Sequence, residues 1–187
     1  MPDTPKTLDT LISTDFKDGQ APGSITPQTM RDLIESIART PFGGYFTETS
    51  VETEIVTKDV YQKGACTTQS NNLRLMDTPV DNRLRFLGTI PYHIHIACTL
   101  SMVSAGNGKK ASFKLFYYDD SAQSGSVIDG SRVNRTIGTG ADEGSTALHW
   151  DLVMDANDYL ELWVANLTDN TNITLTHLYL FAMSIPM

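Results

Sequence analysis

Two histidines, His93 and His95, stand two residues apart in the apolar stretch 92–100. Side chains two apart in a β-strand lie on the same face, so both imidazoles of this pair face one side. Two imidazoles and a third ligand are a common way to bind a transition metal. No Asp, Glu or Cys stands at an obvious supporting spacing. We therefore interpret the pair as polar residues on one face of a sheet and predict no metal site.

Carboxylates gather in a way that suggests calcium, because Ca²⁺ prefers several oxygen ligands from one loop. The pairs are Asp119 with Asp120, Asp142 with Glu143, and Asp155 with Asp158. None of them has the spacing of an EF-hand. Solvated carboxylates in turns are the favoured interpretation.

Ser, His and Asp are all present, but no Gly-x-Ser-x-Gly nucleophile elbow joins a strand to a helix. Ser124-Gly125-Ser126 lies in a flexible loop, and the segment 106–110 lacks both the spacing of a P-loop and a following helix. We predict that the chain is not an enzyme and has no cofactor. Triad residues assemble in space, so the sequence alone does not exclude them. A carboxylic or metal-dependent β-barrel enzyme stays open as an alternative.

Two cysteines, Cys66 and Cys98, are the chain's whole complement of thiols. They can pair in principle. Cys98 lies inside a strand pattern, where small buried thiols are common, and this favours free thiols.

The composition bounds the class of protein. The chain has 187 residues and a formal net charge of −8, with no cluster of Lys and Arg, which argues against a nucleic-acid partner. No apolar run approaches the length that spans a bilayer, and the polar start lacks the pattern of a signal peptide. We expect a protein made in a cytoplasm, with one domain and an appendage.

A short amphipathic helix is predicted over 26–39. Thr26 is a good N-cap and Pro27 a favoured first helical residue. Met30, Leu33, Ile34 and Ile37 follow at i, i+3, i+4 and i+7 and form one apolar stripe. A helix of this length is marginal in water, so another surface must bury the stripe. That surface is either a partner or the chain's own β-domain.

From residue 51 onward the pattern changes to short β-strands. We predict strands near 51–61, 73–76, 83–88, 92–104, 111–118, 145–154, 158–167 and 172–185. These predict an all-β antiparallel sandwich of the jelly-roll type over 46–187, preceded by an arm over 1–45. The segment 119–144 is predicted to be a long excursion with one short strand, suited to mobility or recognition.

Two parts of the sequence resemble tailed-bacteriophage structural proteins. The segment 16–37, with its Gly- and Ile-containing turn and the triplet Arg31-Asp32-Leu33, resembles the N-terminal arm of phage head or tail appendages. The segments 83–101 and 158–166 and the final strand resemble the TNF/C1q-like trimeric jelly roll that follows such arms.

This resemblance implies a homotrimer of the virion. The candidate residues of the trimer interface are Tyr92, Phe116, Tyr118, Trp163, Tyr179 and Phe181. An ordinary place in the sandwich core is the alternative for each of them. On a trimer axis, copies of one histidine can also meet, which would make assembly sensitive to pH.

The function predicted from the resemblance is a capsid decoration or cement protein, or a short head fibre, anchored to the shell by its arm. Its partners are then the chain itself and the major capsid protein or another virion protein, with no nucleic acid and no membrane. One alternative is a tail fibre or receptor-binding tip that recognises its target through 119–144. Another is a carbohydrate-binding jelly roll, in which exposed rings stack on sugars; its candidates are Tyr117, Tyr118, Trp150 and Trp163.

Overall fold

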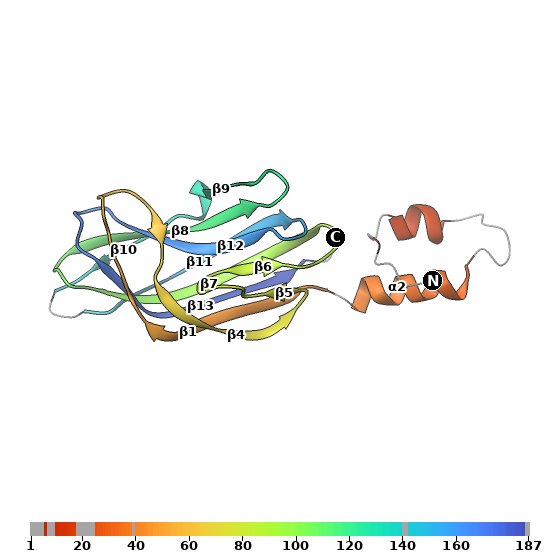
Figure 1. Ribbon diagram of the computed structural model, residues 1–187, viewed down its shortest axis with the longest axis horizontal. Coiled ribbons are helices and arrows are strands. Elements are labelled where there is room, and N and C mark those ends of the chain that lie inside the picture. The colour runs from red at the N-terminus through yellow and green to blue at the C-terminus, as the bar shows by residue number, and fades with distance from the viewer. Residues whose placement is uncertain (1–5, 7–9, 18–24, 39, 140–141, 186–187) are drawn as a thin grey trace.

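Two antiparallel sheets pack face to face, with a helical arm beyond one end of them (Figure 1). The computed structural model describes residues 6, 10–17, 25–38, 40–139 and 142–185, and for residues 12 and 35–38 it describes the backbone alone. The arm contains a π-helical turn, η1 (Leu11–Asp15), and the helix α2 (Pro27–Ala38). Everything described after residue 41 belongs to the two sheets and their connections.

Sheet A has the strand order β11-β7-β13-β1-β4, with a short β2 paired to β13. Its strands are β11 (Gly144–Met154), β7 (Tyr92–Ser104), β13 (Ile173–Ser184), β1 (Phe42–Ser50), β4 (Cys66–Arg74) and β2 (Glu52–Thr53). Sheet B has the order β10-β8-β12-β6-β5, with β3 paired to β12 and β9 paired to β8. Its strands are β10 (Val133–Ile137), β8 (Lys109–Asp119), β12 (Tyr159–Asn166), β6 (Leu84–Phe86), β5 (Met76–Asp77), β3 (Gln62–Lys63) and β9 (Ser124–Val127).

The pairings identify the jelly roll. Of the eight main strands in chain order, the first pairs with the eighth (β1 with β13), the second with the seventh (β6 with β12), the third with the sixth (β7 with β11) and the fourth with the fifth (β8 with β10). This nested antiparallel pairing across two sheets is the jelly-roll arrangement. The all-β sandwich predicted from the sequence is confirmed.

Alternation along the strands builds the core between the sheets. On β7 the buried residues are Ile94, Ile96, Cys98, Leu100 and Met102, every second position, and the residues between them face outward. Phe113, Leu115, Leu160 and Leu162 of sheet B meet them from the other side. Because the inner positions of both sheets are apolar, the outward positions are free to carry other functions.

One polar link crosses the core. The hydroxyl of Tyr45 on β1 donates to Asn82 Oδ1 at 2.7 Å, and the Asn82 amide donates to the carbonyl oxygens of Gly64 and Leu162 at 2.7 and 2.8 Å. The backbone N–H of Leu162 also donates to Asn82 Oδ1, at 3.0 Å. Tyr45 and Asn82 are fully buried, so a single side chain satisfies polar groups of both sheets.

Sequence reasoning placed several strand boundaries well and missed other strands, the short β3 and β9 among them. Most predicted strands match, and β7 matches to the residue. The predicted strand over 51–61 is wrong as one element, because only Glu52–Thr53 of it pairs with β13 and 62–63 forms β3. β1 and β4 were not predicted. Since β1 begins at Phe42, residues 42–45 belong to the sandwich and not to the arm.

The described residues of the excursion, 119–139 and 142–144, form more regular structure than expected. The predicted strand over 133–137 is present as β10, and β9 adds a hairpin to β8, with a 3₁₀ turn, η2 (Asp129–Ser131), between them. Lys114 Nζ reaches Asp129 Oδ1 at 2.6 Å, and Ser131 Oγ accepts from the Leu115 backbone N–H at 2.9 Å. These contacts fix the excursion on sheet B.

Candidate functional site

The outward face of sheet A is the first candidate site, and strand alternation positions it. On β7 and β13 every residue between the buried ones points away from the core. The register places Phe46 of β1 opposite Tyr179 of β13, and Phe181 of β13 opposite Ala97 of β7. His95 of β7 lies between Met183 of β13 and Asp151 of β11. We call this surface the outer A face.

Large apolar side chains remain in contact with solvent on the outer A face. Their exposed fractions are 36% for Phe46, 38% for Tyr179, 46% for Met183 and 49% for Val153. The rings of Tyr179 and Phe181 stack along β13 with centroids 6.3 Å apart. A row of exposed aromatic and aliphatic side chains on one face is typical of a protein–protein contact surface.

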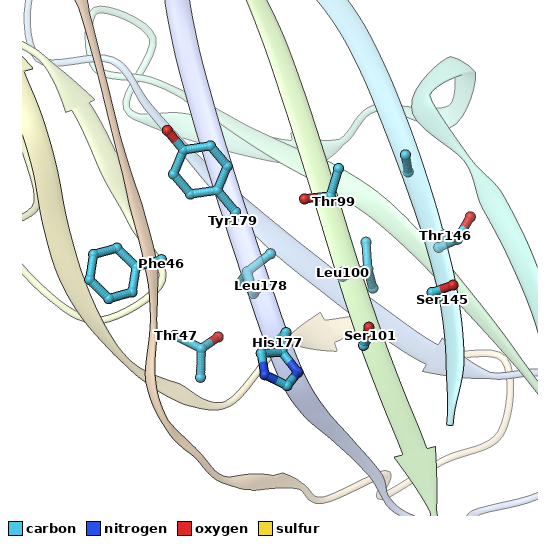
Figure 2. Close-up of a pocket in the computed structure, with 11 residues that line it drawn as sticks. Phe46, Thr47, Thr99, Leu100, Ser101, Ser145, Thr146, His177, Leu178 and Tyr179 are labelled. Atoms are coloured by element: carbon cyan, nitrogen blue, oxygen red, sulfur yellow. The ribbon is translucent and has the colours of Figure 1, made fainter. Parts of the chain in front are cut away.

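A groove of about 510 Å³ crosses this face, with the four strands β1, β13, β7 and β11 side by side beneath it (Figure 2). Phe46 and Tyr179 border it on the side of β1 and β13, together with Thr47, His177 and Leu178, and the side of β7 and β11 is lined mostly by small side chains, with Leu100. The small side chains are Thr99, Ser101, Ser145, Thr146 and Ala147. The groove is therefore shaped by a contrast between bulky and small residues, into which a complementary surface can fit.

A histidine contact lies on the same face. His95 Nδ1 is 2.6 Å from Asp151 Oδ1, and His95 Nε2 is 3.3 Å from His149 Nδ1. The two imidazoles stack with centroids 5.5 Å apart and 27° between their planes. The carboxylate accepts from His95 Nδ1–H, so one hydrogen-bonded chain runs from Asp151 through both rings. The partner of His95 thus comes from the neighbouring strand and not from His93.

Charge is sparse on this face. The strands β11, β7, β13 and β1 contain no Lys or Arg, and their carboxylates are Asp151 and Glu48. In a chain with a net charge of −8, another copy of the chain meets little charge repulsion at this surface.

The six predicted interface residues do not share one face. Tyr179 and Phe181 lie on the outer A face. Tyr92 packs edge-on against the buried Phe86, with ring centroids 6.0 Å apart. The remaining three, Phe116, Tyr118 and Trp163, belong to β8 and β12 of sheet B.

On the outward face of sheet B the aromatic rings stack on one another. Phe116 stacks on Trp163 at 4.5 Å between centroids, and Tyr118 stacks on Tyr159 at 4.6 Å. Beside them the buried Glu161 accepts from Lys63 at 2.9 Å, from Arg83 at 2.7 Å and from Trp163 Nε1 at 2.9 Å. Rings and charges that contact one another leave less surface for a partner than the outer A face does.

The rings proposed for sugar stacking were expected to be exposed, but each of them packs against the core or against another ring. Tyr117 and Trp150 pack against the core, and Tyr117 donates to the buried Asp158 at 2.5 Å. Tyr118 and Trp163 each have a ring face covered by a neighbouring ring. No group of three side chains among the described residues is placed to hold a metal ion. Cys66 and Cys98 are both buried and free, so they do not form a disulfide.

The apolar stripe of α2 is the second candidate site. Thr26 caps this helix, since its hydroxyl accepts from the Thr29 backbone N–H at 3.1 Å. Met30 and Ile34 are 43% and 60% exposed, and Leu33 is half-buried, while the side chain of Ile37 lies outside the described residues. The stripe is therefore not buried against the chain's own sheets, which lie to one side of the arm in Figure 1.

The other side of α2 faces η1. Lys6 Nζ lies 2.5 Å from Asp15 Oδ2 and 3.5 Å from Asp32 Oδ2, linking the turn to the helix. The hydrogen bond with Asp15 raises the pKa of the Lys6 ammonium. Ile34 is two positions beyond Asp32, about 200° around the helix. The arm thus uses a polar side of α2 internally and leaves the apolar side outward.

Several of these features escaped sequence reasoning. Phe46 was missed because β1 was assigned in part to the arm, and His149 was missed because its contact with His95 spans 54 residues. Within the described part of the chain, no helix is both long and apolar enough to cross a membrane.

Comparison with known proteins gives structural similarity alone. No protein-family model matches the sequence, and no curated protein is similar to it. Eiger TNF from S. frugiperda is similar in structure, with a TM-score of 0.48 and 10% identity over 79% of this chain and 94% of that one. Murine APRIL at pH 5.0 is similar with a TM-score of 0.48 and 8% identity, over 78% of this chain and 99% of that one. The fold assignment rests on the strand pairings of the two sheets.

Proposed function

We propose that this chain is a structural protein of a tailed-bacteriophage virion, a capsid decoration or cement protein or a short head fibre. It acts as a homotrimer whose N-terminal arm anchors it to the shell and whose sandwich projects outward. The phage location and the number three come from the sequence resemblance. The feature of the fold that supports the proposal most is the outward-facing stripe of α2.

The arm fits the role of an anchor for a physical reason. Met30 and Ile34 of α2 are exposed, and α2 lies beyond one end of the sandwich (Figure 1). Burying an exposed Met or Ile side chain contributes ~1.5–3 kcal/mol, so the stripe supplies several kcal/mol per chain before the cost of ordering the arm. An apolar groove on another virion protein is the surface that this stripe fits.

Self-association fits the outer A face. Phe46, Tyr179 and Met183 are exposed there, and few charges oppose the approach of a second copy. The groove is a depression into which side chains of a second copy can pack. Joining several arms in one assembly makes the attachment multivalent, so each arm raises the effective concentration of the others at the shell. Association and anchoring then reinforce each other.

The experiment uses purified shells and full-length protein. The double change Met30→Gln and Ile34→Gln removes the apolar stripe without adding charge. Val56→Gln is the control, because Val56 is 66% exposed in the sandwich part of the chain. We expect the double variant to keep its fold and its oligomeric state but to lose co-sedimentation with shells, while the control co-sediments like the wild type. Undiminished co-sedimentation of the double variant contradicts the anchor.

The alternative to a place on the shell is a place on the tail. Gold-labelled antibody against the chain separates shell from tail on intact particles. Label at the tail tip would move the function to receptor binding, with β9 and η2 of the excursion as the first recognition surface to test. Particles without any label would contradict the virion role.

A further inference from the structure

A hydrogen-bonded pair of histidines lies on the surface assigned above to self-association, between β7 and the edge strand β11. His95 Nε2 and His149 Nδ1 are 3.3 Å apart, and the exposed Phe46, Tyr179 and Met183 occupy the same face. We propose that this pair is a proton-sensitive element of the assembly, so that a second proton on the two rings drives the copies of the chain apart. The inference rests on the proposed self-association and adds its regulation.

Counting protons shows why the second one matters. Asp151 accepts from Nδ1–H of His95 at 2.6 Å. Between the rings there is room for one proton, either on His149 Nδ1 or on His95 Nε2. A first added proton leaves one positive charge on the pair, next to the Asp151 carboxylate. A second added proton places N–H groups on both facing nitrogens and two positive charges side by side, so the contact must open.

Among the described residues around the pair, no carboxylate besides Asp151 is in contact to balance a second positive charge. His95 is flanked by β11, which presents Asp151 and His149, and by β13, which presents Met183 directly opposite and Phe181 beside it. On β7 itself the outward neighbours of His95 are His93 and Ala97. The other ionisable groups on the outward face of these strands are Tyr179 and His177, and His177 lies 3.6 Å from Glu143. Asp151 is therefore the one carboxylate in contact with the pair among the described residues.

Association depends on protonation of the two histidines because a second copy, once bound, keeps their rings from moving apart. In a free chain the side chain of His95 is 28% exposed and Asp151 52% exposed, so the rings can separate into water and each can take its proton. When a second copy covers the face, separation would drive an imidazolium into an apolar contact. The dissociated chains then bind more protons than the assembly. Each extra proton weakens association by up to about tenfold per chain for every pH unit of acidification.

The test compares the mass of the assembly at about pH 7.5 and about pH 5, the range in which histidines change charge. His149→Asn keeps a hydrogen-bonding group near the position of Nδ1 and removes the second titrating ring. His177→Asn is the comparison variant, because His177 borders the groove on the same face with its side chain 81% exposed, so it shows whether loss of any histidine on this face removes the response to pH. Circular dichroism at both pH values establishes that the sandwich stays folded.

We expect the wild type and His177→Asn to dissociate on acidification, and His149→Asn to keep its assembly. A wild-type assembly that survives at about pH 5, or a His149→Asn variant that dissociates like the wild type, overturns the proposal and leaves self-association intact. A wild-type chain that is single already at about pH 7.5 contradicts self-association itself, and the switch with it.

Discussion

Phe46 on β1 stands directly opposite Tyr179 on β13, and both rings project into solvent from the outer A face. Cross-strand aromatic pairs stabilise a sheet, but burial of these rings against the core is impossible because Tyr45 and Leu180, their sequence neighbours, already occupy the inner positions. The pair is therefore available to another molecule.

The double change Phe46→Gln and Tyr179→Gln is predicted to weaken self-association. Each aromatic side chain that a neighbouring copy buries contributes about 1.5–3 kcal/mol, which is a factor of about ten or more in the association constant. Sedimentation equilibrium measures the change. The variant Phe116→Gln with Trp163→Gln, on the outward face of sheet B, serves as the comparison. A larger loss for the sheet B variant would move the contact surface to that sheet.

Gly44→Ala is predicted to destabilise the fold. A Cβ at Gly44 would lie 2.2 Å from the Leu180 carbonyl oxygen, a backbone atom of the paired strand that cannot move alone. We expect a loss of about 1–3 kcal/mol in the free energy of unfolding, measured in urea. At Gly106 the nearest atom to a new Cβ is the Lys109 side chain, so Gly106→Ala is the tolerant control. Equal stability of the two variants would argue against close contact of β1 with β13.

Asn82→Ala is predicted to lower the free energy of unfolding more than the same substitution of an exposed asparagine does. It leaves the Tyr45 hydroxyl and the backbone groups of Gly64 and Leu162 without their partner inside the core. Each unsatisfied buried group costs about 1–3 kcal/mol. Thermal and urea unfolding measure the loss, with Asn134→Ala on the edge strand β10 as the control. Similar midpoints for both variants would contradict the polar link between the sheets.

The two thiols are predicted to resist modification in the folded protein. Burial raises the pKa of the Cys66 thiol to about 11, and burial likewise raises the pKa of the Cys98 thiol. At about pH 8 both are therefore protonated and shielded, and iodoacetamide needs the thiolate. We expect labelling of neither cysteine before unfolding and of both in urea under non-reducing conditions. Fewer than two labelled thiols in urea would indicate a disulfide.

Asp169 is predicted to titrate far below an ordinary aspartate. The hydrogen bond from Lys109 Nζ, with further bonds from Thr171, lowers the pKa of this carboxyl to about 2. A lowered pKa stabilises the fold above the unfolded value of about 3.9, and this contribution is lost as the pH falls toward about 2. Carbon NMR of the carboxyl measures the midpoint. Lys109→Met should move it upward, and an unchanged midpoint would exclude Lys109 as the cause.

Much of the fold was predictable from local pattern. β7 alternates cleanly between polar and apolar residues over 92–104, and α2 has an N-cap, a proline and an apolar stripe at helical spacing. β4 was not predictable, because Cys66–Arg74 is mostly polar and becomes a strand by pairing with β1. β1 was hidden by Gly43 and Gly44, which are typical of a helix stop, but Gly44 is required where β1 meets β13 and Gly43 where β1 meets Leu73 of β4.

The site was less accessible to sequence reasoning than the fold. Alternation shows that Phe116 and Phe181 each face outward from a strand, but not which sheet a strand joins. The contact of His95 with His149 depends on the register between β7 and β11, which no local pattern sets. The stripe of α2 was identified from spacing alone, and its exposure follows from the polar side of the helix facing η1.

The roles proposed for the groove, for the histidine pair and for multivalent attachment through the arms all require that the chain associates with copies of itself. The mass of the purified protein in solution at neutral pH tests this most directly. We predict an assembly of three times the 20.6 kDa chain. A mass of one chain at every concentration would contradict it.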